Sequence, residues 1–327
     1  MAAALPEFPS PVTEELQAAA ERLAAGGLVA FATETVYGLG ARADDDAAVA
    51  RIFALKGRPS DHPLIVHVVS VAAAHQFAAE INPLAATLIQ HFWPGPLTLI
   101  VPRRDGMGTA AAGGQPSIGL RMPGHATALA LLRAAAALGV AGLAAPSANR
   151  FGRVSPTTAA HVRDEFGPEL MVLDGGPCAV GIESSIVDVT RGQAVLLRPG
   201  QLGRAALQSA LGQPLHEPDA MAPRVSGSLE SHYAPTATLR LFDAAQLAAR
   251  AAQAGPGVAV YSRSLLPLPG GVMHRAMPSD PDLVARELFA VLRGLDAAGA
   301  TQIWVETPPS SPAWEGVRDR LKRAATA

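Results

Sequence analysis

The side chains that could do chemistry in this sequence lie where apolar segments typical of buried strands come to an end. Hydroxyl and carboxylate groups follow the apolar segment 28–32 as Thr33-Glu34-Thr35, and Ser147 and Asn149 follow the apolar segment 140–145. Ligands of open α/β sheets bind in the crevice at the ends of the strands. We therefore expect four polar clusters to meet at one pocket, namely residues 33–35, 117–121, 146–149 and 183–185.

Cationic side chains lie close to these clusters. Arg58, Arg121 and Arg198 offer bidentate forks for a carboxylate or a phosphate. Only Lys56 and Lys322 among the 26 basic residues are lysines. We interpret Lys56 as a position that needs a compact ammonium, with chance retention as the alternative. Such a set of cations suits a substrate with several phosphates and the electrostatic stabilisation of a phosphoryl transition state.

Each of these residues also has a purely structural explanation. Thr33 and Thr35 could simply end a strand, and Ser147 and Asn149 could stabilise a turn. A single histidine or arginine at such a place is more often structural than functional. No Walker Gly-x-x-x-x-Gly-Lys-Ser/Thr, His-Glu-x-x-His or Gly-x-Ser-x-Gly motif is present. Residue spacing alone therefore supports only an anion-binding α/β enzyme.

The composition restricts the class of protein. The net charge is -2 and aromatic residues make up 5% of the chain, which argues against basic or stacking surfaces for nucleic acid. The single cysteine, Cys178, excludes a disulfide framework and a cysteine-based zinc site. No apolar segment approaches the ~20 residues needed to cross a bilayer, and the N-terminus lacks the basic region of a signal peptide. We expect a soluble cytoplasmic protein.

Helical and strand patterns alternate up to residue 211 and predict an α/β fold with an open, twisted mixed sheet. Within residues 28–69, a strand is followed by Gly38 and Gly40, which we expect to let the backbone approach a ligand or adopt a positive φ. A helix then begins at the acidic residues 44–46 and ends at Gly57. Further strands are predicted at 62–69, 97–101, 117–122, 140–145, 171–174, 185–189 and 194–198, and further helices at 13–25, 71–80, 83–91, 125–138 and 157–166.

A chain of 327 residues is long for a single core, and the sequence pattern divides it in two. Both periodicities fail over residues 212–235, which are rich in proline and serine and predict a linker. Beyond it, strands at 238–242, 257–261 and 301–306 alternate with helices at 244–254, 280–297 and 313–325. This pattern predicts a small Rossmann-like α/β domain, to which no dinucleotide is assigned because its first strand lacks Gly-x-Gly-x-x-Gly.

Several motifs resemble a known family. They are Thr33-Glu34-Thr35-Val36-Tyr37-Gly38-Leu39-Gly40, Lys56-Gly57-Arg58-Pro59, His62-Pro63-Leu64, Trp93-Pro94-Gly95-Pro96-Leu97-Thr98, Arg121-Met122-Pro123, Pro146-Ser147-Ala148-Asn149 and Gly181-Ile182-Glu183-Ser184-Ser185. In this order they strongly resemble the YrdC-like domain of the threonylcarbamoyl-AMP synthases. The match covers about residues 10–205. The stretch Ser231-His232-Tyr233-Ala234-Pro235, followed by a small α/β domain, resembles the long two-domain form of that family.

The resemblance implies a YrdC-like catalytic domain at 10–211, a linker at 212–235 that crosses the active site as a lid, and a small C-terminal α/β domain at 236–327. It implies that L-threonine, bicarbonate and ATP give L-threonylcarbamoyl-AMP and pyrophosphate, for N6-threonylcarbamoyladenosine modification of tRNA. Mg²⁺ would arrive with ATP, and no protein metal site is expected. The product would pass to a tRNA threonylcarbamoyl-transferase, with neither a membrane nor stable nucleic-acid binding involved.

The resemblance also implies roles for single residues. The positions that match the L-threonine site are Thr35, His67, Arg121 and Ser185. The positions that match the ATP site are Lys56, Arg58, His62, Ser117, Ser147, Asn149, Ser155, Arg198 and Tyr233. Lys56 and Arg58 would lie nearest the phosphates and carry catalysis. Two departures from the family are visible: Ser185 stands where Glu-Ser-Thr is common, and Ser226-Gly227-Ser228 stands where many relatives have Ser-Pro-Gly.

Two other functions deserve comparison. A YrdC-like sheet could bind double-stranded RNA or tRNA without forming an adenylate, although the net charge of -2 and the absence of basic runs argue against this. The carbamoyl-transfer protein of hydrogenase maturation also contains a YrdC-like domain. That family adds cysteine-rich zinc fingers and an acylphosphatase module, which one cysteine and 327 residues exclude here.

Overall fold

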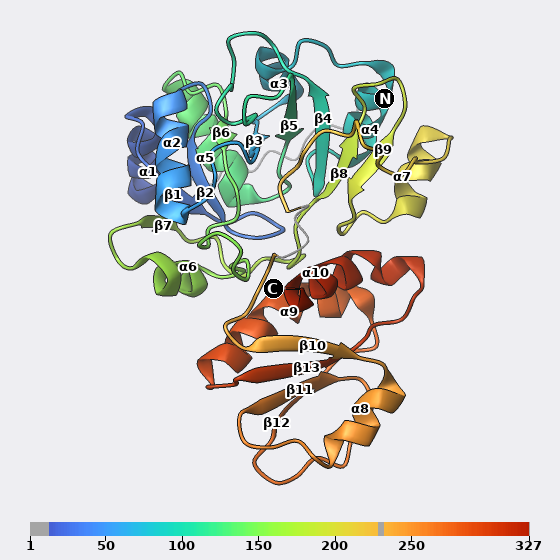
Figure 1. Ribbon diagram of the computed structural model, residues 1–327. Helices are drawn as coiled ribbons and strands as arrows, with labels where there is room; N and C mark the ends of the chain where they lie inside the picture. The colour runs from blue at the N-terminus through green and yellow to red at the C-terminus, as the bar shows by residue number, and fades with distance from the viewer. Residues whose placement is uncertain (1–12, 228–231, 327) are drawn as a thin grey trace.

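The computed structural model describes residues 13–227 and 232–326, which form two α/β domains with a linker between them (Figure 1). The first residues of the predicted catalytic domain, 10–12, and the linker residues 228–231, which include Ser228 and Ser231, lie outside the described residues. None of the described helices is long and apolar enough to cross a membrane.

The larger domain is built on a nine-stranded sheet in the order β7-β1-β2-β6-β3-β5-β4-β8-β9. Its pairs β1·β7, β3·β5 and β4·β8 are parallel and the other five are antiparallel, which confirms the predicted mixed sheet. The strands are β1 (Val29–Phe31), β2 (Gly38–Arg42), β3 (Ile65–His67), β4 (Leu97–Pro102), β5 (Ser117–Arg121), β6 (Leu143–Ala144), β7 (Met171–Leu173), β8 (Ser185–Asp188) and β9 (Val195–Arg198).

Seven helices cover this sheet within the described residues: α1 (Glu14–Ala24), α2 (Asp46–Lys56), α3 (Val71–Phe77), α4 (Pro83–Phe92), α5 (Ala126–Ala137), α6 (Ala159–Phe166) and α7 (Arg204–Leu211). Helix α2 has the predicted ends. The Asp45 carboxylate caps it by accepting from two backbone N–H groups, and Gly57 ends it in the left-handed conformation at φ 65°. The helix thereby carries Lys56 in its last turn and releases the chain directly before Arg58.

The expectation for Gly38 and Gly40 was only partly right. Neither glycine has a positive φ, and both lie in β2, a strand that the sequence pattern did not predict. The reason is the ring of Phe31 on the neighbouring strand, because a Cβ at Gly40 would lie 2.8 Å from it. Gly38 does line the cavity described below, but Gly40 serves the packing of the sheet.

The smaller domain contains a parallel sheet in the order β10-β13-β11-β12. Its strands are β10 (Thr238–Phe242), β11 (Val258–Ser262), β12 (Met273–Ala276) and β13 (Gln302–Glu306), and its helices are α8 (Ala244–Ala251), α9 (Pro281–Ala297) and α10 (Glu315–Ala325). The Rossmann-like pattern was predicted, but β12 was not, because its largely exposed residues form no apolar run. Helices α9 and α10 face the larger domain, and α8 lies on the far side of the sheet (Figure 1).

The two domains touch through glycines as well as side chains. A Cβ at Gly181, which has φ 85°, would lie 2.4 Å from the carbonyl oxygen of Ala285 in α9. A Cβ at Gly316 in α10 would lie 2.9 Å from the carbonyl oxygen of Gly200. Because backbone meets backbone at these points, the polar segment 181–185 lies directly against the smaller domain.

Candidate active site

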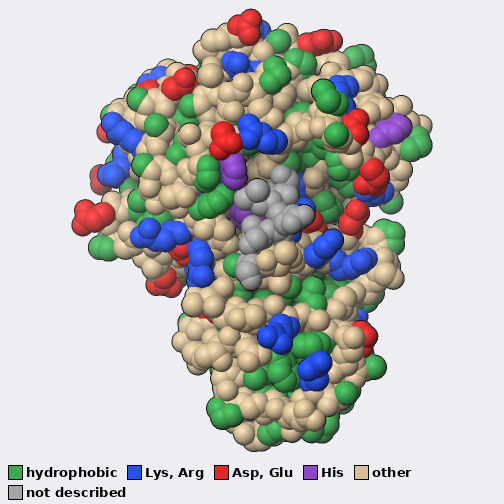
Figure 2. Space-filling view, viewed as in Figure 1, with side chains coloured by type: hydrophobic (Ala, Val, Ile, Leu, Met, Phe, Trp, Pro, Cys, Tyr) green, Lys and Arg blue, Asp and Glu red, His purple; other side chains and the backbone are tan. Residues whose placement is uncertain are grey.

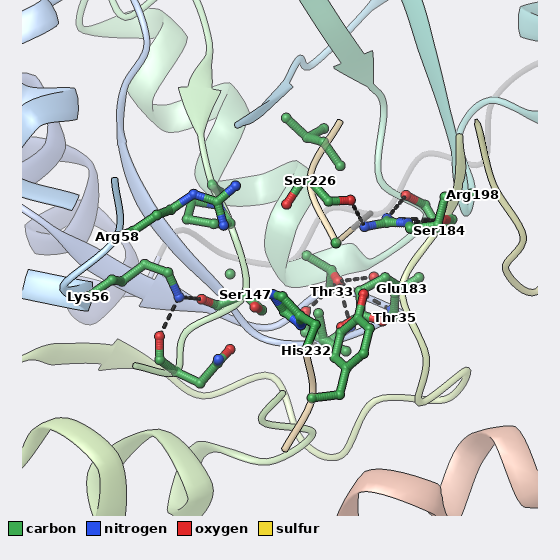
Figure 3. Close-up of a pocket in the computed structure, with 18 of the residues that line it drawn as sticks. Thr33, Thr35, Lys56, Arg58, Ser147, Glu183, Ser184, Arg198, Ser226 and His232 are labelled. Atoms are coloured by element: carbon green, nitrogen blue, oxygen red, sulfur yellow. Dashed lines mark hydrogen bonds between the residues drawn. The ribbon is translucent and has the colours of Figure 1, made fainter. Parts of the chain in front are cut away.

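One cavity collects residues from all four polar clusters and from the linker (Figure 3). Strand ends explain the convergence, because His67, Arg121 and Arg198 are the last residues of β3, β5 and β9. Strands β3 and β5 are parallel, and His67 and Arg121 are direct partners in their register. The polar and linker residues that line the cavity are Thr33, Thr35, Lys56, Arg58, His67, Arg121, Ser147, Asn149, Glu183, Ser184, Arg198, Ser226, Gly227, His232 and Tyr233.

Lys56 enters the cavity from the end of α2 and is almost fully buried, with 3% of its surface exposed. Its ammonium donates to the carbonyl oxygen of Ser147 at 2.6 Å and to that of Asn149. Burial, and secondarily the charge of Arg58, lowers the pKa of Lys56 well below its usual value. An anion that enters the cavity would therefore stabilise the charged form of Lys56.

Arg58 and Arg198 are also buried cations, and most of their hydrogen bonds go to backbone oxygens. Arg58 donates to the carbonyl oxygens of His62 at 3.4 Å and Pro63 at 3.0 Å, and burial lowers its pKa to about 10. Arg198 donates to the carbonyl oxygens of Ser184 at 2.9 Å and Ser226 at 2.7 Å, and burial lowers its pKa as well. In Figure 3, Lys56 and Arg58 come from one side of the cavity and Arg198 from the other.

The three cations lack a carboxylate partner within the described part of the chain. None of its ion pairs involves Lys56, Arg58 or Arg198. Basic side chains also lie on both sides of the junction between the domains on the face shown in Figure 2. Buried charges are normally paired, so this arrangement favours a negatively charged ligand with several anionic groups.

A second group of polar side chains surrounds Arg121. Its guanidinium donates to the hydroxyl of Thr35 at 3.0 Å and to the carbonyl oxygen of Gly95 at 3.1 Å, and it pairs with the Glu34 carboxylate at 2.6 Å. Burial, followed by the charge of Arg121, lowers the pKa of His67 to about 3, so its imidazole is neutral at physiological pH. A hydroxyl, a neutral imidazole and a guanidinium together suit a small ligand with a carboxylate and further polar groups.

The remaining predicted residues lie beside the cavity or behind it. Ser117 and His62 line two adjoining hollows that the linker separates from the main cavity. Ser155 is fully buried and donates to the Glu183 carboxylate at 2.5 Å. Ser185 does not line the cavity, and its hydroxyl donates to the carbonyl oxygen of Leu202 at 2.8 Å. Ser184 lines the cavity, and its hydroxyl is hydrogen-bonded to that of Thr98 at 2.8 Å and accepts from Arg198 Nη2 at 3.2 Å.

The linker fills much of the cavity. The side chains of His232 and Tyr233 are buried in it, and the Tyr233 backbone has the positive φ of 63° that non-glycine residues rarely adopt. Gly227, at φ 74°, packs so tightly that a Cβ there would lie 2.4 Å from the Tyr233 hydroxyl. The space that a water molecule can still enter is about 40 Å³, far below the ~300 Å³ or more of a site that holds a small-molecule ligand.

Among the residues that line the cavity, several had no role assigned from the sequence, including Glu183, Ser184, Phe151 and His232. Glu183 and Ser184 belong to a polar cluster, and the two-residue alternation of a strand could have indicated that Ser184, not Ser185, lines the cavity. His232 stood in the motif that carries Tyr233. No signal in the sequence pointed to Phe151, whose ring stands edge-on to those of His62 and His232.

Comparison with known proteins agrees with this architecture. The family model described as telomere recombination, named for Sua5, YciO and YrdC, matches residues 21–200, and the model for the threonylcarbamoyl-AMP synthase C-terminal domain matches residues 199–326. The threonylcarbamoyl-AMP synthase of Pyrococcus abyssi is 36% identical over 95% of this chain and 94% of its own length. That of Bacillus subtilis is 34% identical over 96% of each chain.

A solved structure has the same fold over nearly the whole chain. The crystal structure of P. abyssi Sua5 complexed with L-threonine superposes with a TM-score of 0.85 at 34% identity, over 95% of both chains. Both domains are therefore shared features of one architecture. The chain belongs to the threonylcarbamoyl-AMP synthase family.

Proposed function

We propose that this protein forms L-threonylcarbamoyl-AMP and pyrophosphate from L-threonine, bicarbonate and ATP. One observation carries the proposal beyond family membership. Three buried cations without a carboxylate partner, Lys56, Arg58 and Arg198, share a cavity with a separate polar group around Arg121. The first set suits a polyphosphate, and the second suits an amino acid.

The reaction needs no nucleophile from the protein. Bicarbonate takes up a proton and loses water to give CO₂, which the threonine amine captures as a carbamate with release of a proton. A carbamate oxygen then attacks the α-phosphorus of ATP while pyrophosphate departs. The protein would hold the two substrates in line and stabilise the negative charge on the departing pyrophosphate. Lys56 and Arg58 would supply that charge stabilisation, because they lie together at the end of α2.

The amino-acid site would be the group around Arg121. Its guanidinium would bind the threonine carboxylate, with Thr35 and His67 beside it. The Ser185 hydroxyl is bonded to the carbonyl oxygen of Leu202, so a contact from position 185 would come from its backbone. The hydroxyl of Ser184, which lines the cavity, is likewise engaged, with Thr98 and Arg198.

The ATP site would begin at the three cations and extend along the linker. Asn149 offers a buried side-chain oxygen without a hydrogen-bond partner, and the Tyr233 hydroxyl is likewise unpartnered. Ser147, Ser155, Ser117 and His62 would complete this half of the site as the family resemblance implies. Ser117 and His62 lie on the far side of linker residues 224–227, so ATP would contact them only after this segment moves.

The linker would act as a lid. The Ser226 carbonyl oxygen takes the place of an anion at Arg198, and His232 and Tyr233 fill the cavity, so ATP and the seated linker exclude each other. Residues 212–235 would therefore withdraw to admit ATP and then close over it. The division into a catalytic domain at 10–211, this linker and a domain at 236–327 belongs to the same proposal.

Mg²⁺ would enter with the nucleotide. Within the described residues no group of three or more His, Cys, Asp or Glu could hold a metal ion. The two carboxylates nearest the substrates, Glu34 and Glu183, are each paired with an arginine. Phosphate oxygens and water would thus be the ligands of the metal, as is usual for Mg²⁺ with nucleotides.

The substrates would be small molecules in the cytoplasm, and the product would be consumed by a transferase that modifies tRNA. The test is pyrophosphate release from ATP by the purified protein. We expect release to require both L-threonine and bicarbonate, with serine a poorer substrate. Release without an amino acid would overturn the proposal, and salt-dependent tRNA binding with no ATP turnover would establish the RNA-binding alternative instead.

A further inference from the structure

A buried arginine of the smaller domain enters the wall of the active site. The side chain of Arg320 in α10 is 0% exposed. Its Nε donates to Glu183 Oε2 at 2.7 Å, and its Nη1 donates to the carbonyl oxygen of Pro199 at 2.9 Å and to Asp319 Oδ2 at 2.6 Å. The guanidinium carbon lies 5.3 Å from the centre of the Tyr233 ring. One side chain of α10 thus contacts the cavity wall, the chain after β9 and the linker.

Its partner Glu183 is an unusual residue for this cavity. Glu183 lines a site whose other charges suit an anionic ligand, and its carboxylate lies 7% exposed beside the hydroxyl of Ser155. A negative charge at this point repels phosphate and attracts Arg198, one of the three cations without a carboxylate partner. An uncompensated carboxylate here would therefore oppose ATP binding.

Arg320 compensates the negative charge of Glu183. Burial raises the pKa of Glu183, but the charge of Arg320 and then that of Arg198 lower it by more, so the carboxylate is ionised. The charged and titratable groups that face it are Arg320 from α10, Arg198 from β9, and His232 and Tyr233 from the linker. Asp319 of α10 pairs with Arg320 at 2.6 Å. Of these, only Arg320 forms an ion pair with it among the described residues.

We propose that Arg320 is a positioning residue of the active site: through it the smaller domain neutralises Glu183 and so leaves Arg198 free for the phosphates of ATP. This inference rests on the proposed function and extends it, because it gives the smaller domain a part in ATP binding. Arg320 itself does not line the cavity, but it contacts two residues that do, Glu183 and Tyr233. It acts through Glu183, Ser155 and Tyr233.

The test is a double-mutant cycle in the full-length protein. Arg320→Met removes the charge and keeps much of the volume, and we expect the Kd for ATP, measured by equilibrium dialysis, to rise at least ~10-fold. Adding Glu183→Gln to Arg320→Met should restore most of the affinity, since the charge that needs compensation is gone. A double variant as weak as Arg320→Met alone would overturn the proposal. Because dialysis needs no turnover, absence of product from the wild type would count against the proposed function only.

A matched control is available at the same domain interface. Arg293 of α9 pairs with Glu165 at 3.0 Å and donates to the carbonyl oxygen of Val154, but neither Arg293 nor Glu165 lines the cavity. Arg293→Met should weaken the interface by a comparable amount, and Glu183→Gln should not restore anything that it loses. Equal recovery in both backgrounds would mean that Glu183→Gln acts through general stability, which would contradict the proposal.

The pH dependence gives a second readout. Without Arg320, burial of Glu183 would raise its pKa, so the carboxylate would take up a proton as the pH falls. The loss of ATP affinity in Arg320→Met should accordingly shrink between pH 8 and pH 6 relative to the wild type. A loss that is independent of pH would contradict a role through charge. Should Arg320→Met not fold, Arg320→Lys keeps the charge and is expected to retain ATP affinity within ~3-fold, and a collapse of affinity in this variant would equally overturn the proposal.

Discussion

Arg198 donates from Nη1 to the carbonyl oxygen of Ser226 at 2.7 Å, so a backbone oxygen of the linker holds the position at which an anion would meet this cation. The contact joins a strand end of the catalytic domain to the segment that would cover it. It also explains how a buried guanidinium is tolerated without an ion pair to a carboxylate among the described residues. The linker and the ligand would compete for the same donor.

The close packing of the linker around Gly227 predicts that one added methyl group there will displace the linker. Gly227→Ala would place a Cβ 2.4 Å from the Tyr233 hydroxyl and 2.9 Å from Arg198 Nη1, at a φ of 74° that favours glycine. We expect the linker to leave the cavity and trypsin to cleave after the exposed Arg224 several-fold faster. Gly212→Ala is the control, because its φ of 65° is equally unfavourable but no atom lies within 4 Å of the added Cβ. Equal cleavage rates in the two variants would show that the linker is not held by this contact.

The proposed phosphate-binding role of Lys56 and Arg58 predicts a loss of turnover without a loss of fold. Lys56→Ala and Arg58→Ala should each lower kcat for pyrophosphate release by ~10²-fold or more, since both would stabilise charge in the transition state. Lys56→Arg should fail as well, because a planar guanidinium does not fit between the carbonyl oxygens of Ser147 and Asn149. Circular dichroism and thermal unfolding provide the check on folding. If these variants unfold, Lys56 and Arg58 are structural.

The polar group around Arg121 predicts that a substitution of this residue will change the KM for the amino acid and leave the KM for ATP nearly unchanged. Arg121→Lys keeps the positive charge but loses the fork that contacts Thr35, Glu34 and Gly95. The KM for L-threonine should rise ~10- to 100-fold, while the KM for ATP should change less than ~3-fold. Steady-state kinetics with each substrate varied in turn separates the two constants. A parallel rise in both would place Arg121 in the general architecture of the cavity.

Buried histidines predict how stability depends on pH. Burial lowers the pKa of His67 to about 3 from an ordinary value near 6.5, so between these values the unfolded chain binds a proton that the folded chain does not. The free energy of unfolding should therefore fall as the pH drops from about 6.5 toward 3, and be unaffected by this residue above 6.5.

The corresponding measurement is urea unfolding of the wild type and His67→Gln at several pH values. The variant has no titratable group at position 67. Its free energy of unfolding should therefore depend less steeply on pH, by up to ~1.4 kcal/mol per pH unit. His232, whose pKa burial also lowers to about 3, remains in both proteins and cancels in the comparison. Identical slopes would mean that His67 is protonated in the folded protein.

Local sequence signals predicted the elements that carry the site. Asp45 and Gly57 marked both ends of α2, and the polar residues after the apolar segments identified the loops that converge. The same reasoning missed β2, because Gly38 and Gly40 are weak strand formers that this sheet uses to accommodate Phe31. It also left Ser184 without a role, since the side-chain alternation of β8 is defined only once its start is known.

Contacts between distant parts of the chain were beyond such reasoning. Arg320 and Glu183 are 137 residues apart, and nothing in the local pattern of α10 marks one of its arginines as buried. The position of the Tyr233 side chain in the cavity likewise depends on how the linker packs against both domains. Both contacts depend on tertiary packing that neither propensity nor periodicity encodes.

The end of α2 has a consequence for how this site binds phosphate. Many nucleotide sites place the phosphates at the positive N-terminal end of a helix, where backbone N–H groups hold the anion. Here Lys56 and Arg58 flank a helix C-terminus, whose macrodipole favours cations and repels anions. The dipole of α2 would therefore help to retain the two side chains and would not itself attract the phosphate. On the proposed assignment, affinity for ATP would depend on a few side-chain charges, and it would be sensitive to salt and to single substitutions.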